Sequence, residues 1–252
     1  PALYDITDDW LLAESASSRE RARLHRREDL LLRQADAVVV CSRALATSRG
    51  RSRDVVLIPN AVDVAEFRRP RPRPDDLPPA PTAVYVGTLH ADRLDVDLCV
   101  ELASRRPEIH VVLIGPSALT REAALRMSDQ PNLRLLGARP YSEIPAYLQH
   151  ADVIVVPHDD TPITDSLDPI KAYECQAVDT AVVATPAAGF RGLDDGIVVA
   201  PRGQFIDAVA NAISGPGRRA STHSLPTWRT RAEQFASVLA TLDQPLPRRA
   251  RT

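Results

Sequence analysis

The segment DSLDPIKAYE, residues 165–174, contains the only lysine of the chain, although the sequence holds 31 lysine and arginine residues in total. Lys171 follows Asp168 and Pro169, a pair typical of a helix start with Pro169 at the first helical position. An ammonium and the free N–H groups of a first helical turn together attract anions. A cation there otherwise costs about 0.3–1 kcal/mol, which suggests that a bound diphosphate supplies the missing negative charge.

Glu174 follows Lys171 at i+3 and therefore shares its helix face. Its carboxylate could accept hydrogen bonds from a ribose that lies just beyond the phosphates. The alternative is an exposed Lys171–Glu174 ion pair worth a few tenths of a kcal/mol. Spacing alone leaves both interpretations open, because an arginine-rich composition also explains the scarcity of lysine.

Two further groups of side chains could do chemistry. Asp95 and Asp97 have a spacing that could hold Mg²⁺ or Mn²⁺ together with a substrate diphosphate. They stand where a helix is expected to begin, so capping and a favourable interaction with the helix dipole are the preferred explanation. His158, followed by two aspartates, comes directly after an apolar run, where a binding loop belongs. Whether it lines a site stays open.

The elements that must position these residues are predicted from apolar runs. Near-continuous Val, Ile and Leu runs bounded by Gly or Pro indicate strands of a parallel sheet buried on both faces. They lie at residues 37–41, 55–58, 83–86, 111–114, 133–136, 153–156, 181–184 and 197–199. Segments with helical spacing lie between them, at residues 95–105, 120–127, 142–149, 169–176 and 205–213. This alternation predicts an α/β fold with a doubly wound parallel sheet and a ligand site at the carboxyl ends of its strands.

The chain divides at a segment rich in proline and arginine, residues 67–81, which we expect to be an extended linker. Residues 1–66 hold a polar amphipathic stretch, about two helices long, and two strands, too little for a complete doubly wound domain. Residues 82–222 hold six expected strands and make a complete one. Residues 223–252 contain a capped amphipathic helix at 227–242 and a frayed tail.

Composition narrows the classes of function. The 252 residues are 44% hydrophobic and 25% charged, as in globular proteins, and the net charge of −2 disfavours nucleic acid as a partner. Cys41, Cys99 and Cys175 lack metal-ligand spacing, which indicates a reducing, cytoplasmic setting and no structural metal. No run is long enough to span a bilayer and no signal peptide is found; because methionine does not come first, we expect a piece of a longer protein. The missing GxGxxG and GxxxxGK[ST] motifs exclude dinucleotide-dependent dehydrogenases and phosphate-loop NTPases.

Seven segments carry a further signal: YDITDDW (4–10), ADAVVVCSRAL (35–45), LIPNAVD (57–63), YVGTLHADRLDVDL (85–98), VVLIGP (111–116), NLRLLGARPYSEIPAYLQHADVIVVP (132–157) and DPIKAYECQA (168–177). In this order they resemble bacterial glycosyltransferases of family 4, which have the GT-B fold, and most of all the subgroup that builds cell-wall glycans and exopolysaccharides. In that fold two Rossmann-like domains face each other across a cleft, the N-terminal one binding the acceptor and the C-terminal one the nucleotide-sugar. The resemblance implies a Rossmann-like donor domain, the C-terminal half of a GT-B fold, preceded by a partial N-terminal domain.

Carried over position by position, the resemblance implies a role for each candidate residue. The donor diphosphate would contact Arg93, Lys171, Ile170 and the Gly87–Thr88 turn. Glu174 would bind the ribose and the Arg139–Pro140 turn the base. The donor sugar would be bordered by His158, Thr164, Asp165 and Asp168. No metal is needed if these cations suffice, no cofactor is expected besides the nucleotide-sugar substrate, and no convincing protein nucleophile is found.

The sequence departs from the family pattern at two places. Many relatives carry a glutamate eight residues before the ribose-binding one, where this chain has Ser166; Asp165 or Asp168 could substitute. The usual Gly and Pro turn before a Val-Val strand is replaced by VDTAVV, residues 178–183, which affects the turn more than the chemistry.

We therefore expect a glycosyltransferase that moves a sugar from a nucleoside-diphosphate sugar to a glycan or lipid-linked acceptor, with retention of configuration as the resemblance implies. We expect a cytoplasmic protein, with peripheral contact to the inner membrane face as an option that the family's acceptors raise. Three alternatives stay open: a non-catalytic nucleotide-sugar-binding fragment, a metal-dependent transferase that uses Asp95 and Asp97, and, more distantly, an epimerase of GT-B architecture. Base, sugar, acceptor and linkage are not defined by the sequence.

Overall fold

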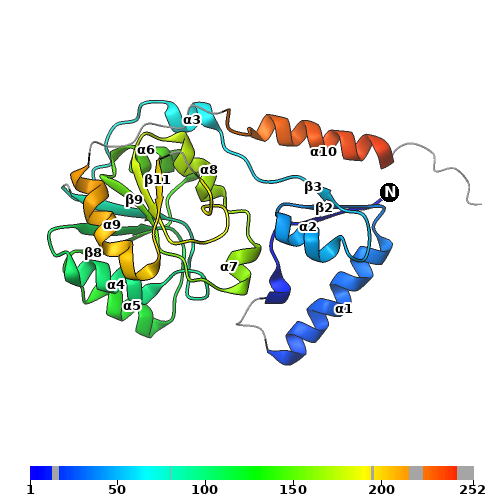
Figure 1. The fold of residues 1–252 in the computed structure, drawn as a ribbon, viewed down its shortest axis with the longest axis horizontal. Coiled ribbons are helices and arrows are strands. Elements are labelled where there is room, and N and C mark those ends of the chain that lie inside the picture. Colours follow the sequence, from blue (N-terminus) through cyan, green and yellow to red (C-terminus); the bar gives the residue numbers. More distant parts are fainter. Residues whose placement is uncertain (13–16, 80, 194–195, 216–223, 243–252) are drawn as a thin grey trace, which may run out of the picture. The chain divides into compact units, whose positions relative to one another are not determined.

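The computed structural model describes residues 1–12, 17–79, 81–193, 196–215 and 224–242, and these fall into two compact units (Figure 1). The first unit comprises Pro1–Ala61, Ser166–Asp168 and Pro226–Thr252. The second comprises Val62–Asp165 and Pro169–Leu225. Across the described residues, no helix combines the length and the hydropathy that a bilayer crossing requires.

The first unit has a small parallel sheet in the order β1 (Leu3–Ile6), β2 (Ala37–Val40) and β3 (Val56–Leu57). Its helices are η1 (Trp10–Leu12), α1 (Ser18–Gln34), α2 (Arg43–Arg49) and α10 (Trp228–Leu242). Helix α1 begins with a capping box, in which Ser17 and Glu20 satisfy each other's backbone N–H groups. The polar stretch that we expected to hold two helices is therefore a single long one within the described residues.

The second unit is built on a six-stranded sheet, in which every neighbouring pair of strands is parallel. The strands are, from one edge to the other, β11 (Ile197–Val199), β10 (Ala181–Ala184), β9 (Val153–Val156), β4 (Thr82–Val86), β6 (His110–Ile114) and β8 (Leu133–Gly137). The chain therefore starts in the middle, at β4, moves outward through β6 and β8, and returns to build the other half from β9. A short parallel pair, β5 (Leu89–His90) and β7 (Ser117–Ala118), extends the loops after β4 and β6.

Helices cover both faces of this sheet (Figure 1). One face packs against α4 (Val96–Arg105), α5 (Arg121–Ser128) and α9 (Arg202–Ser214), and the other against α3 (Val64–Arg68), α6 (Ile144–His150) and α8 (Ile170–Ala177). Two short elements complete the unit, η2 (Tyr141–Glu143) before α6 and α7 (Pro162–Ser166) before α8. Successive residues of β4 alternate between the faces, with Val84 in one core and Ala83 and Tyr85 in the other. The predicted α/β class with a doubly wound parallel sheet is confirmed.

The segment at 67–81, which we expected to be a linker, is counted with the second unit and is fastened to α6. The Gln149 amide donates to the carbonyl oxygens of Phe67 and Arg69, at 2.8 Å each, and accepts the N–H of Arg71 at 3.0 Å. After α3 ends at Arg68, the prolines disfavour helix and strand, so one side chain supplies the partners that a helix or a strand would otherwise provide. The expected boundary at 222 and the tail at 243–252 lie outside the described residues.

Candidate functional site

The order of the strands reverses between β4 and β9, which are direct neighbours in the sheet. The loops that follow these two strands leave in opposite directions, and such a point is where doubly wound sheets bind ligands. Two backbone hydrogen bonds join the loops: Asp95 N–H donates to the Pro157 carbonyl oxygen and Asp159 N–H donates to the Arg93 carbonyl oxygen, both at 2.9 Å. Arg93 and His158 are thereby held at the same place.

Lys171 reaches this place from α8. The helix begins at Ile170, so Pro169 is its N-cap residue and not, as we expected, its first helical residue. Lys171 is thus the second residue of the helix, where backbone N–H groups have no partner within the helix. Its ammonium lies 5.4 Å from the centre of the Tyr85 ring, above the end of β4. Within the second unit, the lysine therefore points toward the strand ends.

Gly87 makes the space that Lys171 occupies. A Cβ atom on Gly87 would lie 2.4 Å from both Cε and Nζ of Lys171, and the glycine has a φ of +148°. We expected Gly87 to contact a diphosphate directly, but its N–H donates to the carbonyl oxygen of Ile114 at 2.8 Å. The backbone N–H is therefore already used, and the contribution of Gly87 to the site is room for the lysine. Thr88, beside it, is exposed.

Charge is concentrated around this lysine. Burial lowers the pKa of Lys171, and the nearby Glu174 carboxylate opposes that shift. Burial likewise raises the pKa of Glu174, and a hydrogen bond from Tyr141 together with the Lys171 charge opposes it. Burial, with Lys171 and Arg93 close by, lowers the pKa of His158 to about 3. Lys171 and Glu174 are thus electrostatic partners, and Arg93 belongs to the same cluster.

His158 is a neutral, buried member of the cluster. Its Nε2 atom lies 3.2 Å from the Tyr85 hydroxyl, and the two rings meet edge to face with their centres 5.9 Å apart. The backbone of His158 is fixed by Thr185, whose Oγ1 accepts the His158 N–H at 3.0 Å and lies 2.7 Å from the His158 carbonyl oxygen. The imidazole can therefore act as a hydrogen-bonding group but adds no positive charge at neutral pH.

The other residues that we expected to border a sugar are arranged differently. Thr164 is only 1% exposed, and its Oγ1 donates to the Asp159 carbonyl oxygen at 2.7 Å, so the hydroxyl caps its own loop. Asp165 is exposed and forms an ion pair with Arg191. Asp168 is counted with the first unit, where its carboxylate accepts the N–H of Asn60 at 2.6 Å. Of these four residues, His158 alone joins the cluster around Lys171.

Arg139, in the expected base-binding turn, is hydrogen-bonded within the protein. Arg139 donates from Nε to the Tyr147 hydroxyl at 3.1 Å and from Nη2 to Asp76 at 2.6 Å, so its guanidinium is engaged within the protein. Pro140 is exposed and precedes Tyr141, whose pKa is raised by burial and by the nearby Glu174 carboxylate. We did not single out Tyr85 or Tyr141 from the sequence. The available signal was the scarcity of aromatic residues, which are only 4% of the chain, together with the position of Tyr85 near the end of an apolar run.

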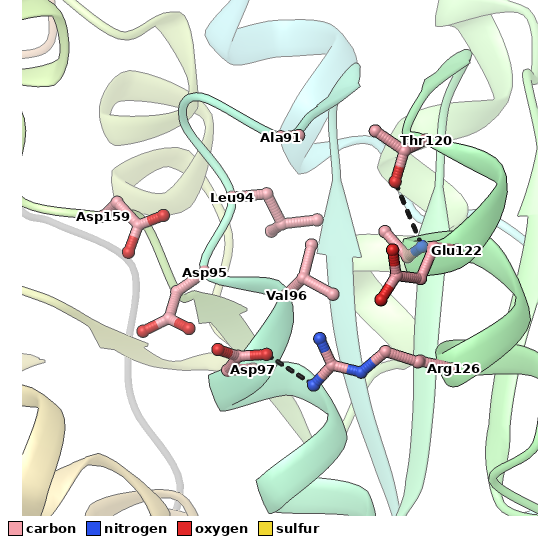
Figure 2. Close-up of a pocket in the computed structure, with 10 residues that line it drawn as sticks. Ala91, Leu94, Asp95, Val96, Asp97, Thr120, Glu122, Arg126 and Asp159 are labelled. Carbon is pink, nitrogen blue, oxygen red and sulfur yellow. Dashed lines mark hydrogen bonds and ion pairs between the residues drawn. The ribbon is translucent and has the colours of Figure 1, made fainter.

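A hollow of about 340 Å³ lies at the amino ends of α4 and α5 (Figure 2). Figure 2 shows Asp95 and Asp159 on one side of it, Thr120 and Glu122 on the other, and Asp97 paired with Arg126. Its acidic lining repels an anionic ligand.

The two aspartates that could have held a metal are both engaged. Asp95 caps α4 by accepting the Leu98 N–H at 2.7 Å and pairs with Arg202 at 2.7 Å, while Asp97 pairs with Arg126 at 2.5 Å. The capping explanation for Asp95 is thus the one that the geometry supports. Among the described residues no group of His, Cys, Asp and Glu is arranged to hold a metal ion.

Comparison with known proteins agrees with this architecture. A curated relative, the putative teichuronic acid biosynthesis glycosyltransferase TuaH of Bacillus subtilis (strain 168), is 23% identical over 198 residues, which are 73% of this chain and 50% of the relative. This chain thus spans about half the length of that protein. Among solved structures, sucrose-phosphate synthase from Thermosynechococcus elongatus superimposes with a TM-score of 0.74 at 18% identity, covering 95% of this chain and 67% of that one. Anabaena HepE in complex with UDP-glucose gives a TM-score of 0.65 at 18% identity, with coverages of 96% and 72%.

The sheet order, the helices on both faces and these structural neighbours define the class as a Rossmann-like unit of the GT-B glycosyltransferase fold. The family model of the glycosyl transferases group 1 matches residues 80–215, more than half of the chain. The chain belongs to this family, and the predicted resemblance is confirmed.

Proposed function

We propose that the second unit binds a nucleoside-diphosphate sugar at the Lys171 cluster and that the protein transfers this sugar to a glycan or lipid-linked acceptor. The observation that carries the proposal is the position of the Lys171 ammonium, at the start of α8 and against Gly87, at the point where the strand order reverses. A diphosphate is the ligand that matches a lysine and a helix amino end placed together.

The proposed role of the Lys171 cluster in the reaction is electrostatic stabilisation of the leaving group. When the bond between the sugar C1 and the diphosphate oxygen breaks, negative charge develops on the leaving nucleoside diphosphate, and Lys171, Arg93 and the amino end of α8 would stabilise it. The acceptor hydroxyl oxygen forms the new bond to C1, and its proton passes to the departing diphosphate. Such a front-face displacement retains the configuration at C1 and needs no protein nucleophile. Glu174 would hold the ribose hydroxyls, and His158 would border the sugar as a neutral group.

The comparisons support this assignment in outline. The family is one of glycosyl transferases, TuaH is named as one, and HepE was crystallised with UDP-glucose. A glycan or a lipid-linked carrier as acceptor, a cytoplasmic location at the inner membrane face, and retention of configuration are part of the proposal. The experiments below test the donor site first, because every further step depends on it.

A thermal-shift series with UDP, GDP, ADP and dTDP tests the proposal on the full 252-residue chain. A nucleotide present at 100 times its Kd stabilises the folded protein by about 2.7 kcal/mol, which corresponds to several degrees in Tm. Lys171→Met removes the charge but keeps most of the buried stem, and should abolish the shift. Arg105→Ala is the matched control, because Arg105 is an exposed cation in the last turn of α4. A shift that survives Lys171→Met contradicts the assignment, and so does the absence of any shift with all four nucleotides.

A second candidate is a nucleotide-sugar-binding protein without turnover. The two candidates differ in whether donor is consumed. Release of free nucleoside diphosphate from the matching nucleotide-sugar, measured with and without an acceptor mixture, distinguishes them: binding through Lys171 without release supports the second.

A further inference from the structure

Gly189 lies against the residue that begins α8. It belongs to the loop that follows β10, and a Cβ atom at Gly189 would come within 2.6 Å of both Cγ and Cδ of Pro169. Carbon atoms in contact are normally about 3.5–4.0 Å apart, so a methyl group there would have to push the proline ring away by roughly 1 Å. Pro169 is the N-cap residue of α8 and makes no side-chain capping hydrogen bond. Packing against Gly189 therefore takes the place of a side-chain cap at the start of this helix.

Pro169 cannot yield without moving the helix. Its Cδ atom is bonded to its own backbone nitrogen, so the ring cannot turn away as a flexible side chain would. Its carbonyl oxygen accepts the N–H of Ala172 at 3.0 Å, which ties the residue to the first turn of α8. The loop after β10 is anchored too, because Phe190, next to Gly189, is fully buried and packs in the same core as Ala172 and Cys175 of α8. A side chain at Gly189 would therefore displace the start of α8.

Lys171 follows Pro169 by two residues and tolerates little displacement. Its ammonium lies against the backbone of Gly87, where a Cβ atom would be 2.4 Å from Nζ. Two glycines thus bound this short segment, Gly189 against the proline ring at its beginning and Gly87 against the ammonium at its end. A hydrogen bond from the ammonium to a phosphate oxygen requires a distance of about 2.7–3.2 Å. A shift of roughly 1 Å at the helix start is enough to lose such a bond.

We propose that Gly189 is a positioning residue of the donor site: because it has no side chain, Pro169 packs closely against it and holds the start of α8 where Lys171 binds the diphosphate. The inference rests on the proposed function, because it extends the same site. It gives the loop after β10 a part in diphosphate affinity through the helix that this loop supports. Since Gly189 acts through Pro169, its effect should disappear when the proline ring is absent.

The same loop supplies a matched control. Gly192, three residues further along, is exposed like Gly189 and has a similar backbone conformation, with a φ of +76° against +81°. Nothing lies within 4 Å of a Cβ atom at Gly192. Gly189→Ala and Gly192→Ala therefore add the same methyl group at a similarly unfavourable φ, and differ in the contact with Pro169. Both variants should lower the Tm, but only Gly189→Ala should lower diphosphate affinity.

Calorimetric titration of pyrophosphate and UDP into the full chain measures that affinity. Gly189→Ala should weaken both ligands by about tenfold or more, the loss expected for a charge-assisted hydrogen bond. Gly192→Ala should bind both as wild type does, and Lys171→Met should weaken both. In a Pro169→Ala background, which lacks Cγ and Cδ, Gly189→Ala should weaken neither ligand further. The Tm of each variant without ligand shows whether it is folded.

The outcomes are distinguishable. If wild type binds pyrophosphate through Lys171 but Gly189→Ala and Gly192→Ala bind it equally well, the inference is overturned while the proposed function stands. A loss from Gly189→Ala that is as large in the Pro169→Ala background as in wild type also overturns it, because the effect would not pass through the ring. If wild type binds neither UDP nor pyrophosphate, the proposed function falls and the inference falls with it.

A second variant keeps the inference testable should Gly189→Ala fail to fold. Pro169→Ala alone removes the contact without adding strain at Gly189. The start of α8 then loses its support, so pyrophosphate and UDP should both bind more weakly than to wild type. Unchanged affinity of a folded Pro169→Ala variant would show that the contact does not position Lys171.

Discussion

The Lys171 ammonium lies 5.4 Å from the centre of the Tyr85 ring, and the hydroxyl of that same ring lies 3.2 Å from Nε2 of His158. One buried aromatic side chain therefore connects the cation of the candidate site to its neutral histidine. The ring face attracts the ammonium, which offsets part of the cost of burying it. His158 lies just after β9 and Lys171 follows in α8, and both contact the Tyr85 side chain of β4.

The first prediction concerns Gly87. Gly87→Ala places a methyl group where Cε and Nζ of Lys171 now lie, so the ammonium must move and nucleotide affinity should fall by about tenfold or more, a cost of at least about 1.4 kcal/mol. Titration with the nucleotide found in the thermal-shift series measures it. Gly203→Ala is the matched control, since nothing lies within 4 Å of a Cβ at Gly203 in α9. Equal affinity of Gly87→Ala and wild type would show that the lysine does not need this position.

The second prediction is the pH dependence of nucleotide binding. Burial lowers the pKa of Lys171 from its ordinary value of 10.5, and only the protonated amine binds a diphosphate well. Affinity should therefore decline as pH rises through this lowered pKa, at a lower pH than for an exposed lysine. Titrations between pH 7 and pH 10 should show that decline in wild type, and a weak, flat profile in Lys171→Met. A wild-type profile as flat as that of the variant would remove Lys171 from the binding step.

The third prediction concerns stability at acid pH. The pKa of His158 is about 3 in the folded chain against an ordinary 6.5, so below pH 6.5 the unfolded chain binds a proton that the folded chain does not. The contribution of His158 to the free energy of unfolding is therefore fully present above pH 6.5 and is lost as the pH falls toward 3. Between pH 7 and pH 5 the free energy of unfolding should fall by about 2 kcal/mol. Urea unfolding of wild type and His158→Gln at both pH values measures it. The decrease in the free energy of unfolding from pH 7 to pH 5 should be smaller by that amount in His158→Gln than in wild type. Equal decreases in the two proteins would contradict a buried neutral histidine.

The fourth prediction concerns metal removal. Asp95 and Asp97 are already paired with Arg202 and Arg126, so a cation would have to compete with two guanidinium groups. Nucleotide affinity should be the same in EDTA and in Mg²⁺, and Asp97→Asn should not change it. A loss in EDTA that Mg²⁺ restores, and that Asp97→Asn reproduces, would favour the metal-dependent transferase.

Much of the second unit could be predicted from its sequence, because strands buried on both faces are near-continuous runs of β-branched residues bounded by turn residues. Strand β9, Val153–Val156, and strand β10, Ala181–Ala184, lie at the residues expected for them. Strand β1 was not predicted, since LYDI alternates and carries an aspartate. The two-residue strands β5 and β7 have no pattern long enough to recognise.

The candidate site was predictable in part. Lys171, Glu174 and Arg93 were identified from charge, helix position and the family resemblance, and the structure brings them into electrostatic reach of one another. The contact between the Lys171 ammonium and the Tyr85 ring joins residues that are far apart in the chain, which no local pattern reveals. The burial of Thr164 was missed because a threonine in a loop has the same sequence signature whether its hydroxyl faces a ligand or caps the loop.

Because residues 67–81 are hydrogen-bonded to α6, a truncated form of the second unit must include them. Phe67 and Leu77 are 1% and 5% exposed and pack in the same core as α6 and α8. A truncated chain that starts at residue 82, the first residue of β4, would lack both side chains. The apolar residues of α6 and α8 that pack against them would then be exposed to water. Limited proteolysis products or expressed pieces that begin near Val62 should stay folded, whereas shorter ones should aggregate.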